Sequence, residues 1–264
     1  MRILSQLEVN KFHNQGNFEN LQHVTEKYTG QNSLFIFDLD FTLVMPKNDL
    51  LKAYSLSRNK EIFFRKINRL NGLERCQFLN FITYYEEVEL VHDGLPILID
   101  SLNKNDFVLG LSSMAFGNVF GMASVHEKRV NEMASLGIIF DKRSCSSRFK
   151  VGQNSVQVFR SNIFTNTVGR EGKAEALLHF LEKNKFIEIL ENIVYIDDNP
   201  DNLIEMEKYI SKSEIFGSIN FVGHLFLEAY RCPPNFPVTL GVDVSKCLDD
   251  LYEIFLFSKN LSMQ

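Results

Sequence analysis

The chain has few cysteines, and none has the spacing of a metal site or a redox pair. Four occur among 264 residues, at Cys76, Cys145, Cys232 and Cys247. Because no CxxC pair is present, the pattern argues against a disulfide framework and against a structural zinc site. None of the four is followed by Arg at the sixth position, so the Cys-x5-Arg phosphatase loop is also absent. We expect a protein that folds in a reducing compartment.

Long apolar runs and an excess of positive charge are missing as well. No stretch approaches the roughly 20 apolar residues that cross a membrane. The N-terminus, Met1–Glu8, has no apolar core of the kind found in signal peptides. The formal net charge is -5, which gives no indication of binding to nucleic acid or to an anionic membrane. We therefore expect a soluble, cytoplasmic protein without a nucleic-acid partner, and the oligomeric state is left open.

The length and composition suit a large folded domain. Hydrophobic residues make up 45% of the sequence, enough for a sizeable core, and 264 residues allow one α/β domain with a modest insertion. Apolar runs that predict strands alternate with segments of helical periodicity, which favours a largely parallel sheet. Residues 141–154 are polar and predict a loop, and residues 155–160 and 162–166 alternate as in a β-hairpin.

The first candidate site lies where a short apolar run meets two carboxylates. Leu34–Phe37 follows a polar turn and predicts a buried strand, and Asp38 and Asp40 come directly after it. Residues two apart on a strand share a side. Two like charges at the end of a buried strand are costly unless something neutralises them. A polar strand end followed by a capped turn is the plainer alternative.

Two further predicted strands end in polar residues. Ser112 and Ser113 follow the apolar run 107–111, and Asp197 and Asp198 follow the apolar run 192–196. A hydroxyl and a backbone N–H at a strand end can hydrogen-bond a phosphate oxygen. The paired carboxylates cannot stay ionised together with Asp38 and Asp40 in a dry site without a cation. Ser112 is equally compatible with a plain turn.

A lysine occurs in the sequence between these two predicted strands. Lys173 precedes a predicted helix over residues 174–183. A cation at a helix start is unfavourable against the helix dipole, so a purely structural role fits it less well. Lys142, Lys150 and Arg170 are alternatives for the same task.

These residues, in this order, resemble the four motifs of the haloacid dehalogenase superfamily, in its Asp-x-Asp-x-Thr phosphatase branch. The motifs are Asp38-Leu39-Asp40-Phe41-Thr42, Ser112, Lys173 and Asp197-Asp198, and they extend from Phe35 to Leu203. The resemblance implies a Rossmann-like core with helices on both faces of a largely parallel sheet. It also implies a small helical cap inserted after the first strand. We place the core at residues 1–44 and 90–264 and the cap at residues 45–89.

The resemblance also implies the chemistry. Asp38 would be the nucleophile that forms an aspartyl-phosphate, Asp40 the general acid and base, and Lys173 the cation that steadies the phosphoryl charge. Ser112, Ser113 and Thr42 would bind the substrate phosphate. Mg²⁺ would be the cofactor, because hard carboxylate oxygens suit it. The predicted ligands are Asp38, Asp40, Asp197 and Asp198.

The substrate is less constrained. The strand end Gly110–Ser113 and the segment Ile219–His224 resemble a bacterial subgroup that includes phosphatases delivered into host cells, among them phosphotyrosine-directed ones. We therefore expect a phosphorylated substrate, including phosphorylated protein, and delivery to a host without a cleavable signal peptide. A sugar or nucleotide phosphatase, a phosphomutase and a catalytically silent binding protein of the same fold are the alternatives.

Overall fold

The computed structural model describes residues 16–48, 51–52, 65, 67–114, 116, 124–140, 147–152, 154–165, 171–185, 189–231 and 244–261. Several predicted features lie outside these ranges. They are residues 53–64 of the predicted cap and the alternatives Lys142 and Arg170. Among the helices that are described, none is both long and apolar enough to cross a bilayer.

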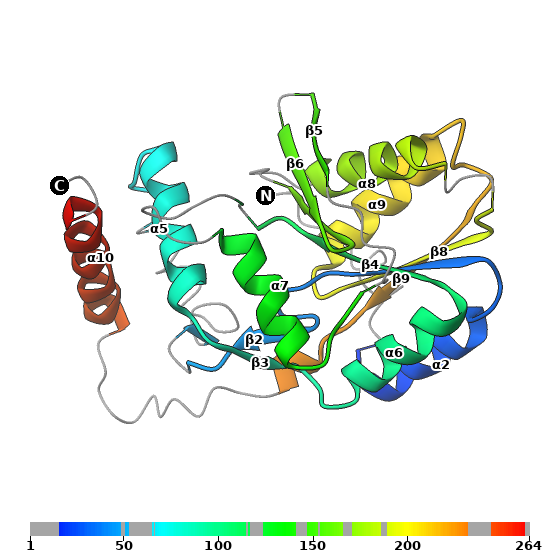
Figure 1. The fold of residues 1–264 in the computed structure, drawn as a ribbon, viewed down its shortest axis with the longest axis horizontal. Coiled ribbons are helices and arrows are strands. Elements are labelled where there is room, and N and C mark those ends of the chain that lie inside the picture. The colour runs from blue at the N-terminus through cyan, green and yellow to red at the C-terminus, as the bar shows by residue number, and fades with distance from the viewer. Residues whose placement is uncertain are drawn as a thin grey trace.

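A seven-stranded sheet forms the centre of the molecule (Figure 1), in the order β5-β6-β7-β4-β1-β8-β9. Five neighbouring strands are parallel: β7 (Asn162–Thr165), β4 (Phe107–Ser112), β1 (Ser33–Phe37), β8 (Asn192–Asp197) and β9 (Asn220–Leu225). Antiparallel pairing adds β6 (Asn154–Phe159) and β5 (Ser147–Val151) at one edge. The Rossmann-like α/β fold expected from the sequence is therefore confirmed.

Helices cover both faces of this sheet because its central strands are apolar on both sides. On β1, Phe35 and Phe37 pack with α2 (Phe18–Tyr28), α6 (Leu95–Asn105) and α7 (Val125–Ser135) in one buried cluster. The alternate residues Leu34 and Ile36 pack with α8 (Glu171–Lys183) and α9 (Pro200–Lys212) in another. A strand with apolar residues on both faces is typical of a parallel sheet between two helical layers.

The segment after the first motif leaves the sheet through a two-stranded ribbon. β2 (Val44–Pro46) pairs antiparallel with β3 (Val88–Leu90). Between them lies α5 (Gly72–Tyr85), whose start is capped by Asn71, since its Oδ1 accepts a hydrogen bond from Glu74 N at 2.9 Å. The ribbon places both ends of the insertion side by side at the edge of the core.

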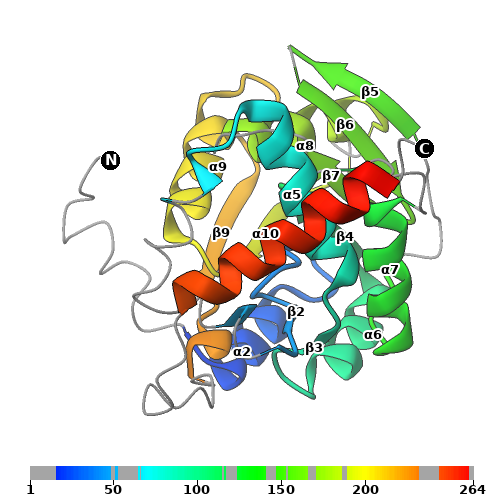
Figure 2. The same cartoon turned by 90° about the vertical axis from the view of Figure 1, so that its left-hand side faces the viewer.

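The C-terminal helix α10 (Val244–Leu261) packs on α5 rather than on the sheet (Figure 2). The ring of Phe255 lies 5.2 Å from that of Phe78 and 5.7 Å from that of Phe81. Tyr252 Oη also donates to Glu74 Oε1 at 2.7 Å. Our sequence boundaries assigned residues 244–264 to the core. In the structure the described part of this segment contacts the insertion, and the division into core and cap stays a prediction.

Two local predictions were wrong. The cap predicted at residues 45–89 was expected to be helical, but its two ends are the paired strands β2 and β3. Part of the loop expected at 141–154 is β5, because Phe149 and Val151 pack against the sheet's second apolar cluster. Residues 136–140, for which the sequence left open a short strand or a helix exit, form an irregular exit from α7, turned by Gly137 at φ 86°.

Candidate active site

The two carboxylate motifs meet because β1 and β8 are parallel neighbours in register. Phe37 pairs with Ile196, and the backbone N–H of Asp38 donates to Ile196 O at 2.8 Å. Asp38 follows β1 and Asp197 ends β8. The carboxyl ends of parallel strands are where α/β folds gather their active residues.

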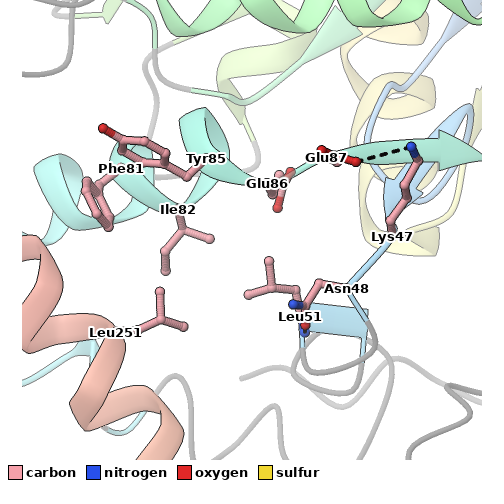
Figure 3. Close-up of a pocket in the computed structure, with 9 residues that line it drawn as sticks. All are labelled: Lys47, Asn48, Leu51, Phe81, Ile82, Tyr85, Glu86, Glu87 and Leu251. Carbon is pink, nitrogen blue, oxygen red and sulfur yellow. Dashed lines mark hydrogen bonds and ion pairs between the residues drawn. The ribbon is translucent and has the colours of Figure 1, made fainter.

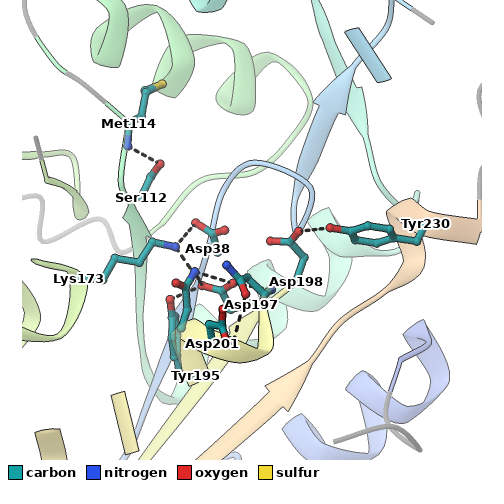
Figure 4. Close-up of polar contacts among 11 residues, drawn as sticks. Asp38, Ser112, Met114, Lys173, Tyr195, Asp197, Asp198, Asp201 and Tyr230 are labelled. Atoms are coloured by element: carbon teal, nitrogen blue, oxygen red, sulfur yellow. Dashed lines mark hydrogen bonds and ion pairs between the residues drawn. The ribbon is translucent and has the colours of Figure 1, made fainter. Parts of the chain in front are cut away.

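Lys173 comes from the first turn of α8 and joins the two carboxylates (Figure 4). Its Nζ donates to Asp38 Oδ1 at 2.7 Å and to Asp197 Oδ2 at 2.9 Å. All three residues are buried, with Asp197 fully enclosed. Burial would lower the pKa of Lys173, but the charges of Asp197 and Asp38 outweigh it and raise that pKa. The lysine therefore carries its charge in the folded protein.

Asp38 has an unusual electrostatic environment for a carboxylate. Burial raises its pKa well above the ordinary value, Lys173 opposes this, and the negative charges of Asp197 and Asp198 raise it further. A carboxylate in this position gains from any additional cation nearby. Strongly shifted groups that share a charged partner are characteristic of functional sites.

Both carboxylate oxygens of Asp197 accept hydrogen bonds from several donors. Its Oδ1 accepts from Asn199 N at 2.8 Å and from Asn202 Nδ2 at 3.0 Å. Its Oδ2 accepts from Lys173, from Asn202 Nδ2 at 2.9 Å and from the hydroxyl of Tyr195. These donors occupy the oxygens of Asp197, so in this arrangement the residue anchors Lys173 and leaves little capacity for a metal ion.

Asp198 points differently from its neighbour. It is half-buried, and Tyr230 of the short 3-10 helix η2 (Glu228–Arg231) donates its hydroxyl to Asp198 Oδ2 at 2.8 Å. One carboxylate oxygen from each of Asp38, Asp197 and Asp198 lies within 4.8 Å of the other two. Burial and the charge of Asp198 raise the pKa of Tyr230, so its hydroxyl stays a donor.

The predicted phosphate-binding residues lie at different depths. Ser112 ends β4 beside β1 and is buried, and its Oγ accepts from Met114 N at 3.1 Å. Ser113 is exposed. Thr42 is fully buried, and its hydroxyl has no hydrogen-bond partner among the described residues. Figure 4 shows Ser112 on the strand next to Asp38 and Lys173.

Asp40 lies apart from the three grouped carboxylates. Its side chain is 36% exposed, and its Oδ1 is 3.4 Å from Arg129 Nη2. Arg129 is a buried residue of α7. The structure therefore brings together three of the four predicted metal ligands, and it directs the carboxylate of Asp40 towards an arginine.

The chemistry of the donor set fits Mg²⁺ through Asp38 and Asp198. Mg²⁺ binds through one or two protein carboxylates and keeps several waters. The oxygens of Asp197 are already hydrogen-bonded. Burial, together with the charges of Asp197 and Asp198, raises the pKa of Asp38, so a bound cation would stabilise its charged form. No group of three or more possible ligands other than this one is found in the described part of the chain.

A pocket of about 500 Å³ lies on the insertion side (Figure 3). Residues of α5, of the β2 loop and of α10 line it, including Tyr85, Glu86 and Leu251. Its lining shares no residue with the group formed by Asp38, Asp197 and Asp198. The pocket and the carboxylate group are therefore separate features.

Sequence reasoning missed several residues of this site. Tyr195 is two positions before Asp197 on the same strand, and side-chain alternation places both on one face, which was a usable indication. Asn199 and Asn202 stand in the loop directly after Asp198. Tyr230 and Arg129 are distant in the sequence, and no motif pointed to them. The competing cation Lys150 lies on β5 and is exposed.

Comparison with known proteins shows the family. Residues 15–241 match the family model described as "Protein of unknown function (DUF2608)", and the chain belongs to that family. Among solved structures it is similar to a HAD family hydrolase from Salmonella enterica subsp. enterica serovar Typhi. That similarity has a TM-score of 0.39 and 12% sequence identity, over 79% of this chain and 76% of that chain. No curated protein matches.

Proposed function

We propose that the protein is a Mg²⁺-dependent phosphomonoester hydrolase of the haloacid dehalogenase type. The observation that supports this most directly is the buried Lys173, held 2.7 Å from Asp38 and 2.9 Å from Asp197 at the ends of adjacent parallel strands. A nucleophile, a fixed cation and a half-exposed carboxylate at Asp198 are the parts that phosphoryl transfer requires, since its catalysis is mostly positioning and charge stabilisation.

In this proposal Asp38 attacks the phosphorus and forms an aspartyl-phosphate, while the ester bond breaks. Asp40 gives its proton to the leaving oxygen. It then takes a proton from the water that hydrolyses the aspartyl-phosphate, which releases phosphate and restores Asp38. Lys173 keeps its charge beside Asp38 throughout. Mg²⁺, when bound by Asp38 and Asp198, supplies charge that offsets repulsion between carboxylate and phosphate.

We propose phosphorylated protein, including phosphotyrosine, as the substrate. Asp38 is buried whereas the side chain of Asp40 is 36% exposed, so the leaving group would depart on the Asp40 side, where solvent has access. The described part of the insertion contributes a single long helix, α5, which favours a bulky phosphoester over a fully enclosed small molecule. The sequence resemblance supports a cytoplasmic protein of a bacterium that delivers it to a host cell.

The test is phosphate release by the full chain from a phosphotyrosine peptide, a sugar phosphate, a nucleotide and an aryl phosphate, with Mg²⁺ and with chelator. We expect the phosphotyrosine peptide to be the best substrate, hydrolysis to stop with chelator and return with Mg²⁺. Asp38→Asn should reduce turnover to background, and the exposed Asp93→Asn serves as the matched control. Hydrolysis that resists chelator or survives Asp38→Asn in a folded protein would contradict the mechanism. A sugar phosphate as the best substrate would leave the mechanism intact and overturn the substrate class.

A further inference from the structure

Arg129 is a buried cation that joins the first motif to the insertion. Its side chain is 1% exposed on α7. One nitrogen, Nη2, contacts both Asp40 Oδ1, at 3.4 Å, and Glu86 Oε1, through a hydrogen bond. Asp40 lies shortly after β1, and Glu86 is the residue directly after α5. Asp40 and the end of the insertion helix therefore share the same donor.

The rest of the guanidinium is less occupied. Nη1 lies 3.6 Å from Glu132 Oε2, and neither Nη1 nor Nε has a hydrogen-bond partner among the described residues. The contacts of Arg129 are thus concentrated on Nη2. Asp40 and Glu86 contact the same nitrogen. A change at Glu86 would therefore change the orientation of the guanidinium group towards Asp40.

The carboxylates around Arg129 stabilise its positive charge. Burial lowers its pKa, but Asp40, Glu86 and Glu132 outweigh this and raise it. Burial also raises the pKa of Glu86, an effect that Arg129 opposes and Asp40 reinforces. Lys128 adds a second cation, since its Nζ donates to Glu132 and, at 2.9 Å, to the backbone oxygen of Glu86.

We propose that Arg129 is a positioning residue for Asp40, and that Glu86 makes this positioning depend on the end of the insertion helix. The inference rests on the proposed function, in which Asp40 protonates the leaving oxygen. A planar guanidinium can direct two carboxylates at once, whereas an ammonium group acts as a point charge. Loss of this geometry should harm proton transfer more than nucleophilic attack by Asp38.

Leaving-group dependence separates these two steps. An aryl phosphate with an acidic leaving group, 4-nitrophenyl phosphate, needs little protonation, whereas an alkyl phosphate such as phosphoserine needs a proton donor. We compare Arg129→Lys and Glu86→Gln with the matched control Glu132→Gln, which removes a carboxylate near Arg129 that does not contact Asp40. Thermal unfolding monitors the fold of each variant.

We expect both Arg129→Lys and Glu86→Gln to lower the ratio of alkyl to aryl turnover, by about tenfold or more given the usual 10²- to 10⁴-fold contribution of general acid catalysis. Glu132→Gln should leave the ratio within about twofold, because Asp40 keeps its partner. Glu86→Gln retains the buried arginine, so it provides a folded variant if Arg129→Lys unfolds.

The outcomes separate the inference from the function on which it rests. If the wild type hydrolyses both esters through Asp38 and the ratio is unchanged in the folded variants, Arg129 is only structural and the inference is overturned. An equal change in Glu132→Gln overturns it as well, since the effect then does not pass through Asp40. If the wild type hydrolyses neither ester, the proposed function fails and the inference fails with it.

Discussion

Two buried cations hold carboxylates in this protein, and they do so in different ways. Lys173 lies between Asp38 and Asp197 at the ends of adjacent strands, and all three residues belong to the core. Arg129 lies between Asp40 and Glu86, which belong to the core and to the insertion. Lysine suits the first place because it supplies a compact charge to a small cluster. Arginine suits the second because one guanidinium nitrogen carries two N–H groups, which can face two carboxylates from different elements.

The difference teaches how positive charge is distributed over the candidate site. Around Lys173 the negative charges of Asp38, Asp197 and Asp198 outnumber the single positive charge of the lysine. One oxygen from each carboxylate lies within 4.8 Å of the other two. Around Arg129 the second cation Lys128 reduces the excess. We therefore expect the Lys173 cluster to respond to an added divalent cation and the Arg129 cluster not to respond.

The largest expected effects come from removing either cation. Lys173→Met should lower the free energy of unfolding by about 3–5 kcal/mol, because it leaves buried carboxylates without a counter-charge. Arg129→Met should cost less, because Asp40 is 36% exposed and Lys128 remains as a second cation. Excess Mg²⁺ should recover part of the loss in Lys173→Met, by about 2.7 kcal/mol at a concentration a hundred times the dissociation constant. Denaturant unfolding with and without Mg²⁺ measures both.

Arg129→Met should gain from Mg²⁺ only what the wild type gains, because its metal site is intact, whereas Lys173→Met should gain more than the wild type, because the added cation replaces a missing charge. Equal recovery in the two variants would remove the distinction between the clusters. Lys104→Met, at an exposed lysine paired with Asp100 on α6, is the control for loss of a surface cation.

A smaller effect should come from His224, a buried titratable group without a counter-charge. It is fully enclosed on β9, and burial lowers its pKa from 6.5 to about 4. The unfolded chain therefore takes up a proton near pH 6.5 while the folded protein does not. The free energy of unfolding should therefore have its full value above pH 6.5. It should decrease by roughly 3 kcal/mol as the pH falls towards 4.

His224→Leu should remove this part of the pH dependence without loss of stability at pH 7, because neither ring nitrogen has a hydrogen-bond partner among the described residues. The matched control is His23→Leu, whose side chain is 80% exposed on α2. Unfolding curves between pH 4 and pH 8 provide the measurement. An unchanged slope in His224→Leu would show that other groups, such as the buried carboxylates, govern acid stability.

The smallest effects should separate Asp197 from Asp198. Tyr195→Phe removes one of several donors to buried Asp197 and should cost about 1–2 kcal/mol of stability, with little change in Mg²⁺ binding.

Tyr230→Phe removes the donor to Asp198 at a residue that is 43% exposed, so stability should change by less than about 1 kcal/mol. Its Mg²⁺ affinity should fall by about tenfold or more, as for other partners of metal ligands. Calorimetric titration with Mg²⁺ decides between these roles, and the reverse pattern would make Asp197 the ligand.

Much of the sheet could be predicted because its strands are continuous apolar runs. β1, β4 and β8 were expected close to their observed limits, since a strand buried on both faces differs clearly from the amphipathic helices beside it. The strands β2, β3 and β5 were missed because they are short or lie at an edge. Their pairing comes from partners distant in the chain, not from local pattern.

The candidate site divides in the same way. Asp38, Ser112 and Asp198 were expected together because each stands at the carboxyl end of a predicted parallel strand, and such ends meet along one edge. Arg129 offered a weaker indication that was not used. It lies four residues after Val125 and four before Met133, on the buried face of α7, where a charge requires a partner.

The sequence by itself determined the strand–helix alternation, the order of the motifs and the excess of carboxylates at the strand ends, because these depend on local periodicity and residue type. Only the tertiary structure decided which cation serves which carboxylate, that the oxygens of Asp197 are taken by Tyr195 and Asn202, and that α10 packs on α5. The physical reason is that hydrogen bonds and ion pairs between buried groups depend on distances of a few ångströms across elements far apart in the chain. Local sequence pattern does not contain those distances.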